Sequence, residues 1–335
     1  MSERKLAVGV IGGGSWPTAM IKMLGDNKAQ KEVHWWVRSK EKADYIKEFR
    51  RNPNYLRAVN IKIPKRNVHA DIVRTIRSSD IVILNTPAAY LKDALTPVTP
   101  EMFTDKVIVS AIKGIVPDEN QIVGEYLQEK YGIPLDRIVV ISGPCHAEEV
   151  SLEKLSYLTV ACTDTTVSSR VAGLIATHYI KTIVSDDIYG TEYAAVLKNI
   201  YALACGICHG VGFGDNFQAV LVSNALREMA TFVNAVHPIE RDIKESAYLG
   251  DLLVTAYSQF SRNRVFGNMI GKGYSVRAAQ LEMDMVAEGY FAANCIQQIC
   301  EKHGIHMPIC NAVYNILYQG RPLASEMNAL AETFV

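Results

Sequence analysis

The chain has 335 residues, of which 49% are apolar and 21% charged, so it is long enough to form two domains that each bury a sizeable core. Its 35 basic and 35 acidic residues balance, which excludes a whole-molecule field that would draw the protein to nucleic acid or to an anionic membrane. We therefore expect no nucleic-acid partner, no membrane insertion, and local binding of any anionic ligand.

The first half of the chain alternates short runs rich in Val and Ile with stretches of helical length. Strands are predicted over residues 6–12, 32–37, 80–87, 106–114 and 137–144, and two more over 157–163 and 181–187. Continuous apolar strands separated by helix-length connections are typical of a parallel sheet that is covered on both faces. The pattern predicts a doubly wound α/β domain.

The strand pattern stops at about Tyr189. Apolar residues then recur at helical spacing over residues 192–209, 216–236, 275–302 and 308–335. No repeat and no Pro/Gly/Ser-rich linker marks a boundary, so the division rests on this change of pattern. We predict a first domain over residues 1–188 and an all-helical second domain over residues 189–335.

The first predicted strand leads into "GVIGGGSWPTAM", residues 9–20. A glycine-rich turn between a strand and a helix lets the backbone approach a pyrophosphate, whose charge then lies at the helix N-terminus. Gly12 and Gly14 occupy the first two glycine positions of this fingerprint, and Pro17 stands at the third. Proline is tolerated in a first helical turn because its missing N–H would have no partner within the helix. The turn predicts a dinucleotide site, and a tight turn that binds nothing is the alternative.

Arg38 follows the second predicted strand. In NAD-selective sites an Asp or Glu often stands there and accepts hydrogen bonds from the ribose hydroxyls, whereas an arginine can pair with a 2′-phosphate. The cofactor is therefore predicted to be NAD or NADP, with NADP slightly favoured. A solvated arginine at a strand end is the alternative.

Other polar residues lie where ligands of such folds are bound, at the carboxyl ends of strands. Lys113 stands at the end of the strand predicted over 106–114, and Ser142, Gly143 and Cys145 stand at the end of the one predicted over 137–144. A lysine at this edge could hold an oxygen or a phosphate of the substrate.

The helical half adds a second group of polar residues. Lys198 and Asn199 interrupt an apolar helical stretch, which costs free energy unless the two side chains are paired or in use. Farther along the chain come Asp251, Thr255, Ser261, Arg262 and Asn263. Arginine offers a planar fork to a phosphate, and Asp and Asn suit hydroxyls, so the group suits a small phosphorylated polyol.

Two other motifs receive structural interpretations. "CGICHG" at 205–210 has the C-x-x-C-H spacing of haem attachment and the C-x-x-C spacing of redox sites. Because it lies within an apolar helical run and the chain shows no export signal, we interpret it as part of a core helix. "HGIH" at 303–306 is interpreted as surface, and no metal site is predicted.

The chain start has only a short apolar stretch before its glycines, and no later segment approaches the roughly 18 apolar residues of a membrane span. The seven cysteines are scattered and odd in number, which suits reduced thiols better than a disulfide framework. We expect a cytoplasmic protein.

Taken in order, these motifs resemble the NAD(P)-dependent glycerol-3-phosphate dehydrogenases of bacterial type over nearly the whole chain. The matching pieces are "GGGSWPTA", "AIKGI", "SGPCHAEEV", "EYAAVLKNIYALACGI", "GFGDN", "GDLLVT", "SRNRVFG" and "VAEG". The resemblance implies a Rossmann-type domain followed by a helical substrate-binding and catalytic domain, a homodimer, and reversible oxidation of sn-glycerol 3-phosphate to dihydroxyacetone phosphate. Such an enzyme would supply glycerol 3-phosphate for phospholipid synthesis.

Carried over residue by residue, the resemblance implies that Lys198 is the proton acceptor. It places these residues around the substrate: Lys113, Gly143, Asp251, Ser261, Arg262 and Asn263, to which we add Cys145 and Thr255 from their positions in the chain. The glycine turn and the resemblance together place these against the nucleotide: Gly12, Gly14, Ser15, Trp16, Arg38, Lys113, Ala147, Arg262, Val286 and Glu288.

The chain departs from the family pattern at three places. Pro17 replaces the third glycine, Cys145 stands where Ser or Thr is usual, and "ESAYLGDL" replaces a segment richer in glycine. Two alternatives therefore stay open: a dehydrogenase of another small hydroxy acid or phosphorylated polyol, and a nucleotide-sensing relative without turnover. Intact Lys113, Lys198, Asp251 and Arg262 argue against the sensor, which need not keep a proton-transfer group.

Overall fold

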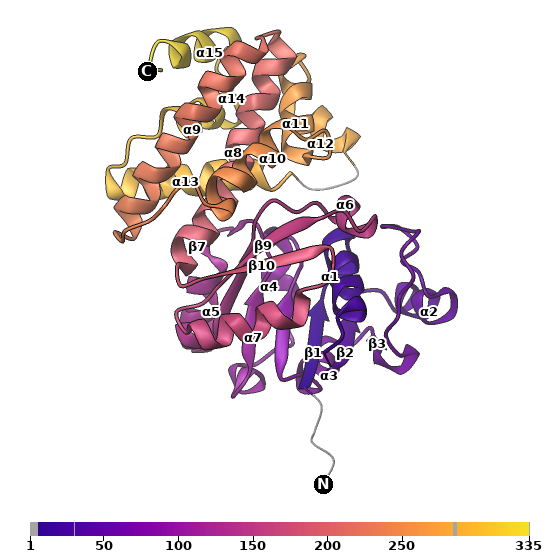
Figure 1. Cartoon of the computed structure of the whole chain (residues 1–335). Helices are drawn as coiled ribbons and strands as arrows, with labels where there is room; N and C mark the ends of the chain where they lie inside the picture. The colour runs from indigo at the N-terminus through magenta and orange to yellow at the C-terminus, as the bar shows by residue number, and fades with distance from the viewer. Residues whose placement is uncertain (1–5, 30, 284–286, 335) are drawn as a thin grey trace. The chain divides into compact units, whose positions relative to one another are not determined.

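A computed structural model describes residues 6–29, 31–283 and 287–334 (Figure 1). The chain divides into two compact units, one of residues 1–112 and 123–188 and the other of residues 113–122 and 189–335. The segment 113–122, which the sequence analysis assigned to the first domain, belongs to the second unit. The reason is hydrophobic packing, because Ile115 and Ile122 are buried in the core of the helical unit.

The first unit is built on an eight-stranded sheet in the order β10-β9-β8-β5-β4-β1-β2-β3. The strands are β1 (Leu6–Ile11), β2 (Lys31–Trp36), β3 (Val68–His69), β4 (Ile81–Leu84), β5 (Val107–Ser110), β8 (Ile138–Ser142), β9 (Ser156–Ala161) and β10 (Ile180–Ser185). Central strands such as β4 are buried along their whole length, as the continuous apolar runs predicted. The predicted α/β class, with a helical region after it, is confirmed.

One feature of the sheet differs from the expectation of parallel strands. β8 and β9 pair antiparallel, and β10 then pairs parallel to β9, so the last two strands run against the others. The only α-helix between β8 and β9 is α6 (Ala147–Ser151), which has five residues. At 1.5 Å per residue such a helix is shorter than a strand, so it does not carry the chain back for a parallel crossover.

Short helices connect the strands of this unit. They are α1 (Ser15–Asp26), α2 (Lys40–Phe49), α3 (Ile72–Arg77), α4 (Leu91–Leu95), α5 (Val123–Tyr131), α6 and α7 (Thr165–Ile175), with 3-10 turns η1 (Lys65–Asn67), η2 (Ala88–Tyr90), η3 (Pro100–Phe103) and η4 (Leu135–Arg137). α1 packs against α6 and α7, whereas α3 packs against η3, which also contacts α5.

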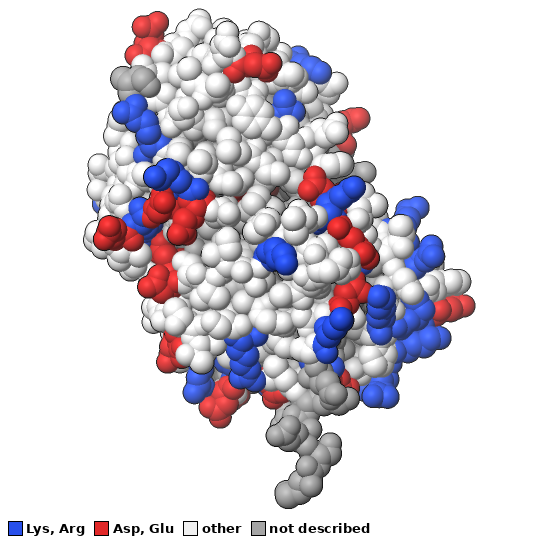
Figure 2. All heavy atoms as spheres, viewed as in Figure 1, with Lys and Arg blue, Asp and Glu red and all other residues white. Residues whose placement is uncertain are grey.

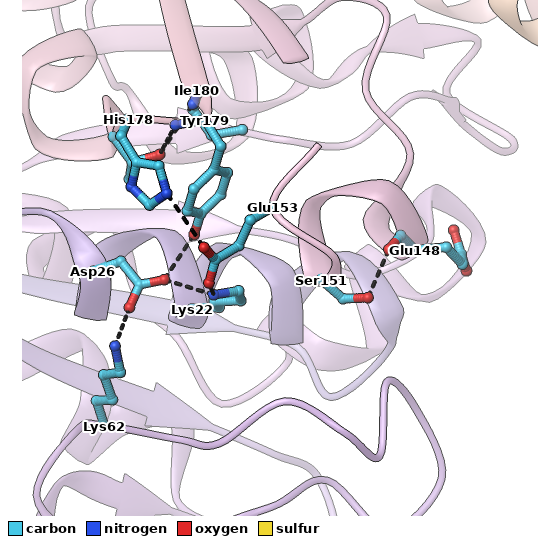
Figure 3. Close-up of polar contacts among 10 residues, drawn as sticks. Lys22, Asp26, Lys62, Glu148, Ser151, Glu153, His178, Tyr179 and Ile180 are labelled. Atoms are coloured by element: carbon cyan, nitrogen blue, oxygen red, sulfur yellow. Dashed lines mark hydrogen bonds and ion pairs between the residues drawn. The ribbon is translucent and has the colours of Figure 1, made fainter. Parts of the chain in front are cut away.

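A polar cluster holds the C-terminal end of α1 to the rest of the first unit (Figure 3). Asp26 accepts hydrogen bonds from Lys22 at 2.7 Å and from the hydroxyl of Tyr179 at 2.8 Å, and it also pairs with Lys62. Lys22 bonds Glu153 at 2.7 Å as well. These residues come from α1, the segment before β3, the segment after α6 and the residue before β10. The cluster therefore fixes α1, whose first turn follows the glycine motif.

The second unit is helical apart from a hairpin of β6 (Ile115–Val116) and β7 (Gln121–Ile122). Its helices are α8 (Ile188–Val211), α9 (Asp215–Val236), a π-helical turn η5 (Ser246–Gly250), α10 (Asp251–Tyr257), α11 (Arg262–Gly271), α12 (Val276–Glu282), α13 (Glu288–His303), α14 (Pro308–Tyr318) and α15 (Leu323–Ala331). The stretches 275–302 and 308–335 each contain two helices instead of one, and α10 and α11 had no counterpart in the sequence prediction.

α8 is the central helix of this unit. It is long and apolar enough to cross a membrane by length and composition, contrary to the expectation from sequence, but 83% of its most apolar window is buried within the unit, as in the core helix of a soluble protein. Cys205 and Cys208 lie on it and are buried, in agreement with their interpretation as core residues.

Glycines let α8 and α11 touch backbone to backbone. A Cβ added at Gly206 would lie 2.1 Å from the carbonyl oxygen of Arg264, and one at Gly267 would lie 2.2 Å from the carbonyl oxygen of Leu203. Gly210 and Gly271 form the same kind of contact one turn farther on. The crossing holds the N-terminal end of α11 beside α8. It thereby brings Asn263 of α11 into contact with Asn199, the neighbour of Lys198 in α8.

Candidate active site

Three charged side chains of the second unit meet in its interior. Lys113 precedes the β6–β7 hairpin, Lys198 lies in α8, and Asp251 is the first residue of α10, directly after the π-helical turn. The Lys113 ammonium lies 3.1 Å from Oδ2 of Asp251, and Lys198 bonds Oδ1 of the same carboxylate. Asp251 is 1% exposed and Lys198 4%, whereas Lys113 is partly exposed, so the buried carboxylate joins one buried cation to one at the edge of the interior.

Burial sets the charge states of this group. Burial lowers the pKa of Lys198 to about 7; the carboxylate of Asp251 opposes this change, and the charge of Lys113 adds to it. Burial raises the pKa of the Asp251 carboxyl, but the ammonium groups of Lys113 and Lys198 outweigh it and hold that pKa below its usual range. The site therefore contains an amine that can exchange a proton near neutral pH, beside a carboxylate that stays ionised.

A chain of amide hydrogen bonds connects this group to α11 and α13. Nδ2 of Asn199 donates to the carbonyl oxygen of Lys113 at 2.7 Å, and its Oδ1 accepts from Nδ2 of Asn263 at 2.9 Å. Oδ1 of Asn263 accepts from the backbone N–H of Gly289 at 2.9 Å. The two buried Asn side chains thus fix Lys113, the start of α11 and the start of α13 with respect to one another.

The N-terminal turn of α11 carries Arg262 beside the capping residue Ser261. Ser261 caps the helix, because its Oγ accepts from the backbone N–H of Arg264 at 3.3 Å. Arg262 is partly exposed, and its guanidinium forms no hydrogen bond or ion pair with any residue that the structure describes. On α10, Thr255 donates to the carbonyl oxygen of Asp251 at 2.6 Å. A guanidinium without a protein partner near a buried acid–base group suits an anionic substrate.

In the first unit the glycine turn has the shape that a dinucleotide needs. Gly12 has φ +136°, and a Cβ there would lie 2.5 Å from the carbonyl oxygen of Asn85, so only glycine fits. Pro17 lies in the first turn of α1 and contacts Gly12, since the same Cβ would lie 2.9 Å from its Cγ. The proline at the third fingerprint position thus leaves the turn intact, and the residues present fit a dinucleotide at the start of α1.

Comparison with known proteins accounts for both features. Residues 7–168 match the family profile described as "NAD-dependent glycerol-3-phosphate dehydrogenase N-terminus", and residues 187–328 match the corresponding C-terminus. The chain belongs to this dehydrogenase family. Membership makes it an NAD(P)-dependent oxidoreductase, so the family predicted from the motifs is confirmed.

Individual relatives agree with this assignment. A glycerol-3-phosphate dehydrogenase (NAD(P)+) of Corynebacterium kroppenstedtii is 34% identical over 98% of this chain and 98% of its own length. One of Oceanobacillus iheyensis is 33% identical over 94% of this chain and 90% of its own length. The crystal structure of glycerol-3-phosphate dehydrogenase from Coxiella burnetii superimposes with a TM-score of 0.89 at 26% identity, covering 98% of this chain and 99% of that one.

The predicted site residues of the dehydrogenase are divided between the two units. Those in the second unit are Lys113, Lys198, Asp251, Thr255, Ser261, Arg262, Asn263 and Glu288, the first residue of α13. Those in the first unit are Gly12, Gly14, Ser15, Trp16, Arg38, Gly143, Cys145 and Ala147. Val286 lies outside the described residues.

Several of these residues have a structural role that the sequence did not indicate. Ser261 is a helix cap, and both ends of the Asn263 amide bond other residues of the protein. Gly143 has φ +118°, and a Cβ there would lie 2.9 Å from the carbonyl oxygen of Tyr157. The sequence singled out Asn199 as a polar residue in an apolar helix, which was the signal available, but it did not indicate Gly289, whose N–H bonds Asn263.

Proposed function

We infer that this chain interconverts sn-glycerol 3-phosphate and dihydroxyacetone phosphate, with NAD(P) as the hydride carrier. The observation that carries the inference is a buried lysine, its pKa lowered by burial, in contact with a carboxylate that also pairs with a second lysine, in a chain of the glycerol-3-phosphate dehydrogenase family. Bound NAD(P) supplies or accepts the hydride at C2 of the substrate.

Lys198 is proposed as the proton-transfer group. In the oxidation direction its neutral amine accepts the proton of the C2 hydroxyl, and in the reduction direction its ammonium returns that proton to the developing alkoxide. Asp251 holds the Nζ atom of Lys198 in place and supports the charged form, while Lys113 favours the neutral form. The opposing charges keep both forms of the amine available at neutral pH.

Arg262 is proposed to bind the phosphate of the substrate, because its guanidinium is partly exposed and forms no ion pair within the described chain. Lys113 and Asp251 are proposed to contact the substrate oxygens, and Asn263 to act by positioning. The first unit is proposed as the dinucleotide-binding domain, with Arg38 favouring NADP. Together with this reaction we propose a cytoplasmic location and the supply of glycerol 3-phosphate to phospholipid synthesis.

We also propose a homodimer. Support comes from exposed apolar side chains on and between helices of the second unit, a kind of surface that subunit contacts cover: Val220, Leu253, Tyr257, Phe260 and Val265. Light scattering coupled to size-exclusion chromatography tests this proposal, and a monomeric mass at micromolar concentration would contradict it.

The test of the reaction is consumption of NADPH or NADH on addition of dihydroxyacetone phosphate. Lys198→Met should lower kcat by roughly 10²–10⁴-fold while fluorescence titration shows unchanged NADPH binding. Lys272→Met, which removes an exposed lysine after α11, is the matched control and should turn over normally. A Lys198 variant with near-normal turnover would show that another group transfers the proton, and no turnover by the unaltered protein would refute the function.

A further inference from the structure

Arg38 has a neighbouring cation in the first unit, Lys42. The end of β2 is joined to the glycine turn, because the N–H of Gly12 donates to the carbonyl oxygen of Trp36 at 3.1 Å and the indole N–H of Trp35 donates to that of Gly12 at 2.7 Å. Arg38 follows two residues after Trp36 and is exposed. The chain then enters α2, which carries Lys42 in its first turn.

The side chain of Lys42 lies along the glycine turn. A Cβ added at Gly13 would lie 3.3 Å from Val37 and 3.8 Å from Cδ of Lys42, so the lysine stem passes beside the backbone of the turn. Its ammonium group lies 5.4 Å from the centre of the Tyr55 ring, at the distance of a cation–π contact. Lys42 is half-buried, and its contacts with the glycine turn and with Tyr55 hold its side chain in place.

Asn52 makes this arrangement rigid. Its Nδ2 donates to the carbonyl oxygen of Gly13 at 3.1 Å and to Oγ1 of Thr18 at 2.8 Å. Its Oδ1 accepts from the backbone N–H of Tyr55 at 3.3 Å. Asn52 is fully buried, so the ring that faces Lys42 is fixed to the same glycine turn that the lysine stem crosses.

Arg38 and Lys42 are like charges without a counter-charge. Burial lowers the pKa of Lys42, and the charge of Arg38 lowers it further. Within residues 6–29, 31–283 and 287–334, no carboxylate pairs with either side chain. Figure 2 shows Lys and Arg gathered over α2 and the segment after it, and residues 38–66 contain ten Lys and Arg against three Asp and Glu. Two unneutralised cations on a basic surface are suited to an anion with more than one charge.

We propose that Lys42 is a second specificity-determining residue, which together with Arg38 binds the 2′-phosphate of NADP. The proposal rests on the proposed use of NAD(P) and adds a residue to it. In dinucleotide-binding folds the adenosine ribose lies at the end of the second strand, where Arg38 stands. Arginine binds a phosphate with its planar fork and lysine with a point charge, whereas a neutral ribose hydroxyl gains little from two cations.

The test compares two probes that differ at the 2′ position, adenosine 2′,5′-bisphosphate and 5′-AMP, by calorimetric titration of the full chain. Lys42→Gln should raise the Kd for the bisphosphate about tenfold or more, the size of one charge-assisted hydrogen bond, and should change the Kd for 5′-AMP less than about twofold. Lys42→Arg keeps the charge and should keep the preference. Lys40→Gln removes an exposed neighbouring cation and is the matched control.

If Lys42→Gln raised the Kd values of both probes equally, the proposal would be overturned, because the lysine would then bind the part of the nucleotide that the two probes share. An effect of Lys40→Gln as large as that of Lys42→Gln would also overturn it, in favour of the general basic surface. Thermal melting of each variant without ligand separates binding from folding. Turnover of dihydroxyacetone phosphate by the unaltered protein with NADH or NADPH tests the proposed function separately: without turnover that function fails, whatever the probes show.

Discussion

The contact between α8 and α11 gives a prediction that links packing to activity. Replacing Gly267 by Ala would place a Cβ 2.2 Å from the carbonyl oxygen of Leu203 and 3.0 Å from the backbone nitrogen of Ile207. Both neighbours are backbone atoms of α8, so no side chain can move aside. The helices have to separate by about 1 Å to reach an ordinary contact distance.

Two effects follow from this separation. Overpacking of a core costs about 1–3 kcal/mol of unfolding free energy, and we expect about 3 kcal/mol because the added methyl group meets backbone atoms. For a unit of this size, that loss corresponds to a fall of about 6–12 °C in melting temperature. The hydrogen bond from Asn263 to Asn199, now 2.9 Å, would also lengthen by about 1 Å and be lost. Since misplacement by this distance can cost about 100-fold in rate, kcat/KM for dihydroxyacetone phosphate should fall at least about tenfold.

The assay combines calorimetric melting, steady-state kinetics and NADPH titration. The matched control is Gly173→Ala in α7, an exposed helical glycine with no atom within 4 Å of the added Cβ, which should stabilise the protein by about 0.5–1 kcal/mol. NADPH binding should be unchanged in the Gly173→Ala control, because the added methyl group meets no other atom. A Gly267→Ala variant that melts and turns over like the unaltered protein would refute the close contact.

Other predictions test charge. Asp251→Asn removes the carboxylate that supports the charged form of Lys198, so the pKa of Lys198, about 7 in the unaltered protein, should fall. In oxidation kcat/KM rises with pH and in reduction it falls, and both changes should occur at least about one pH unit lower in the variant. A pH profile that stays in place would contradict the pairing of Asp251 with Lys198. Arg262→Ala should weaken phosphorylated substrates by about 1.5–3 kcal/mol and dihydroxyacetone much less, which kinetics with both substrates would check. The buried ring nitrogens of His34 and His69 lie 3.2 Å apart, and burial lowers the pKa of His69 to about 4. The stabilising effect of neutral His69 is therefore complete above about pH 6.5 and is lost as the pH falls towards 4. The free energy of unfolding, measured in urea melts, should fall by about 2 kcal/mol between pH 7 and pH 5. His69→Phe should make the free energy of unfolding depend less on pH.

Much of the molecule could be read from local sequence. Apolar runs located the main strands, helical spacing located α8 and α9, and the glycine turn indicated the dinucleotide site, because each depends on residues that are neighbours in the chain. Lys198 stood out for a similar reason, as a charge within an apolar helix. Family-specific motifs then indicated the reaction.

Tertiary structure decided what those residues meet. Lys113 and Asp251 are 138 residues apart, and their contact arises only because the hairpin after Lys113 packs into the helical unit. "CGICHG" reads as a pair of cysteines, yet Gly206 is the residue that the fold requires, because α11 occupies the space of its missing side chain. The position of Lys42 beside Gly13 likewise depends on Asn52, whose bonds reach back along the chain. Local patterns determine the elements and the reactive side chains, whereas contacts between distant segments determine their partners, since those depend on how the elements pack.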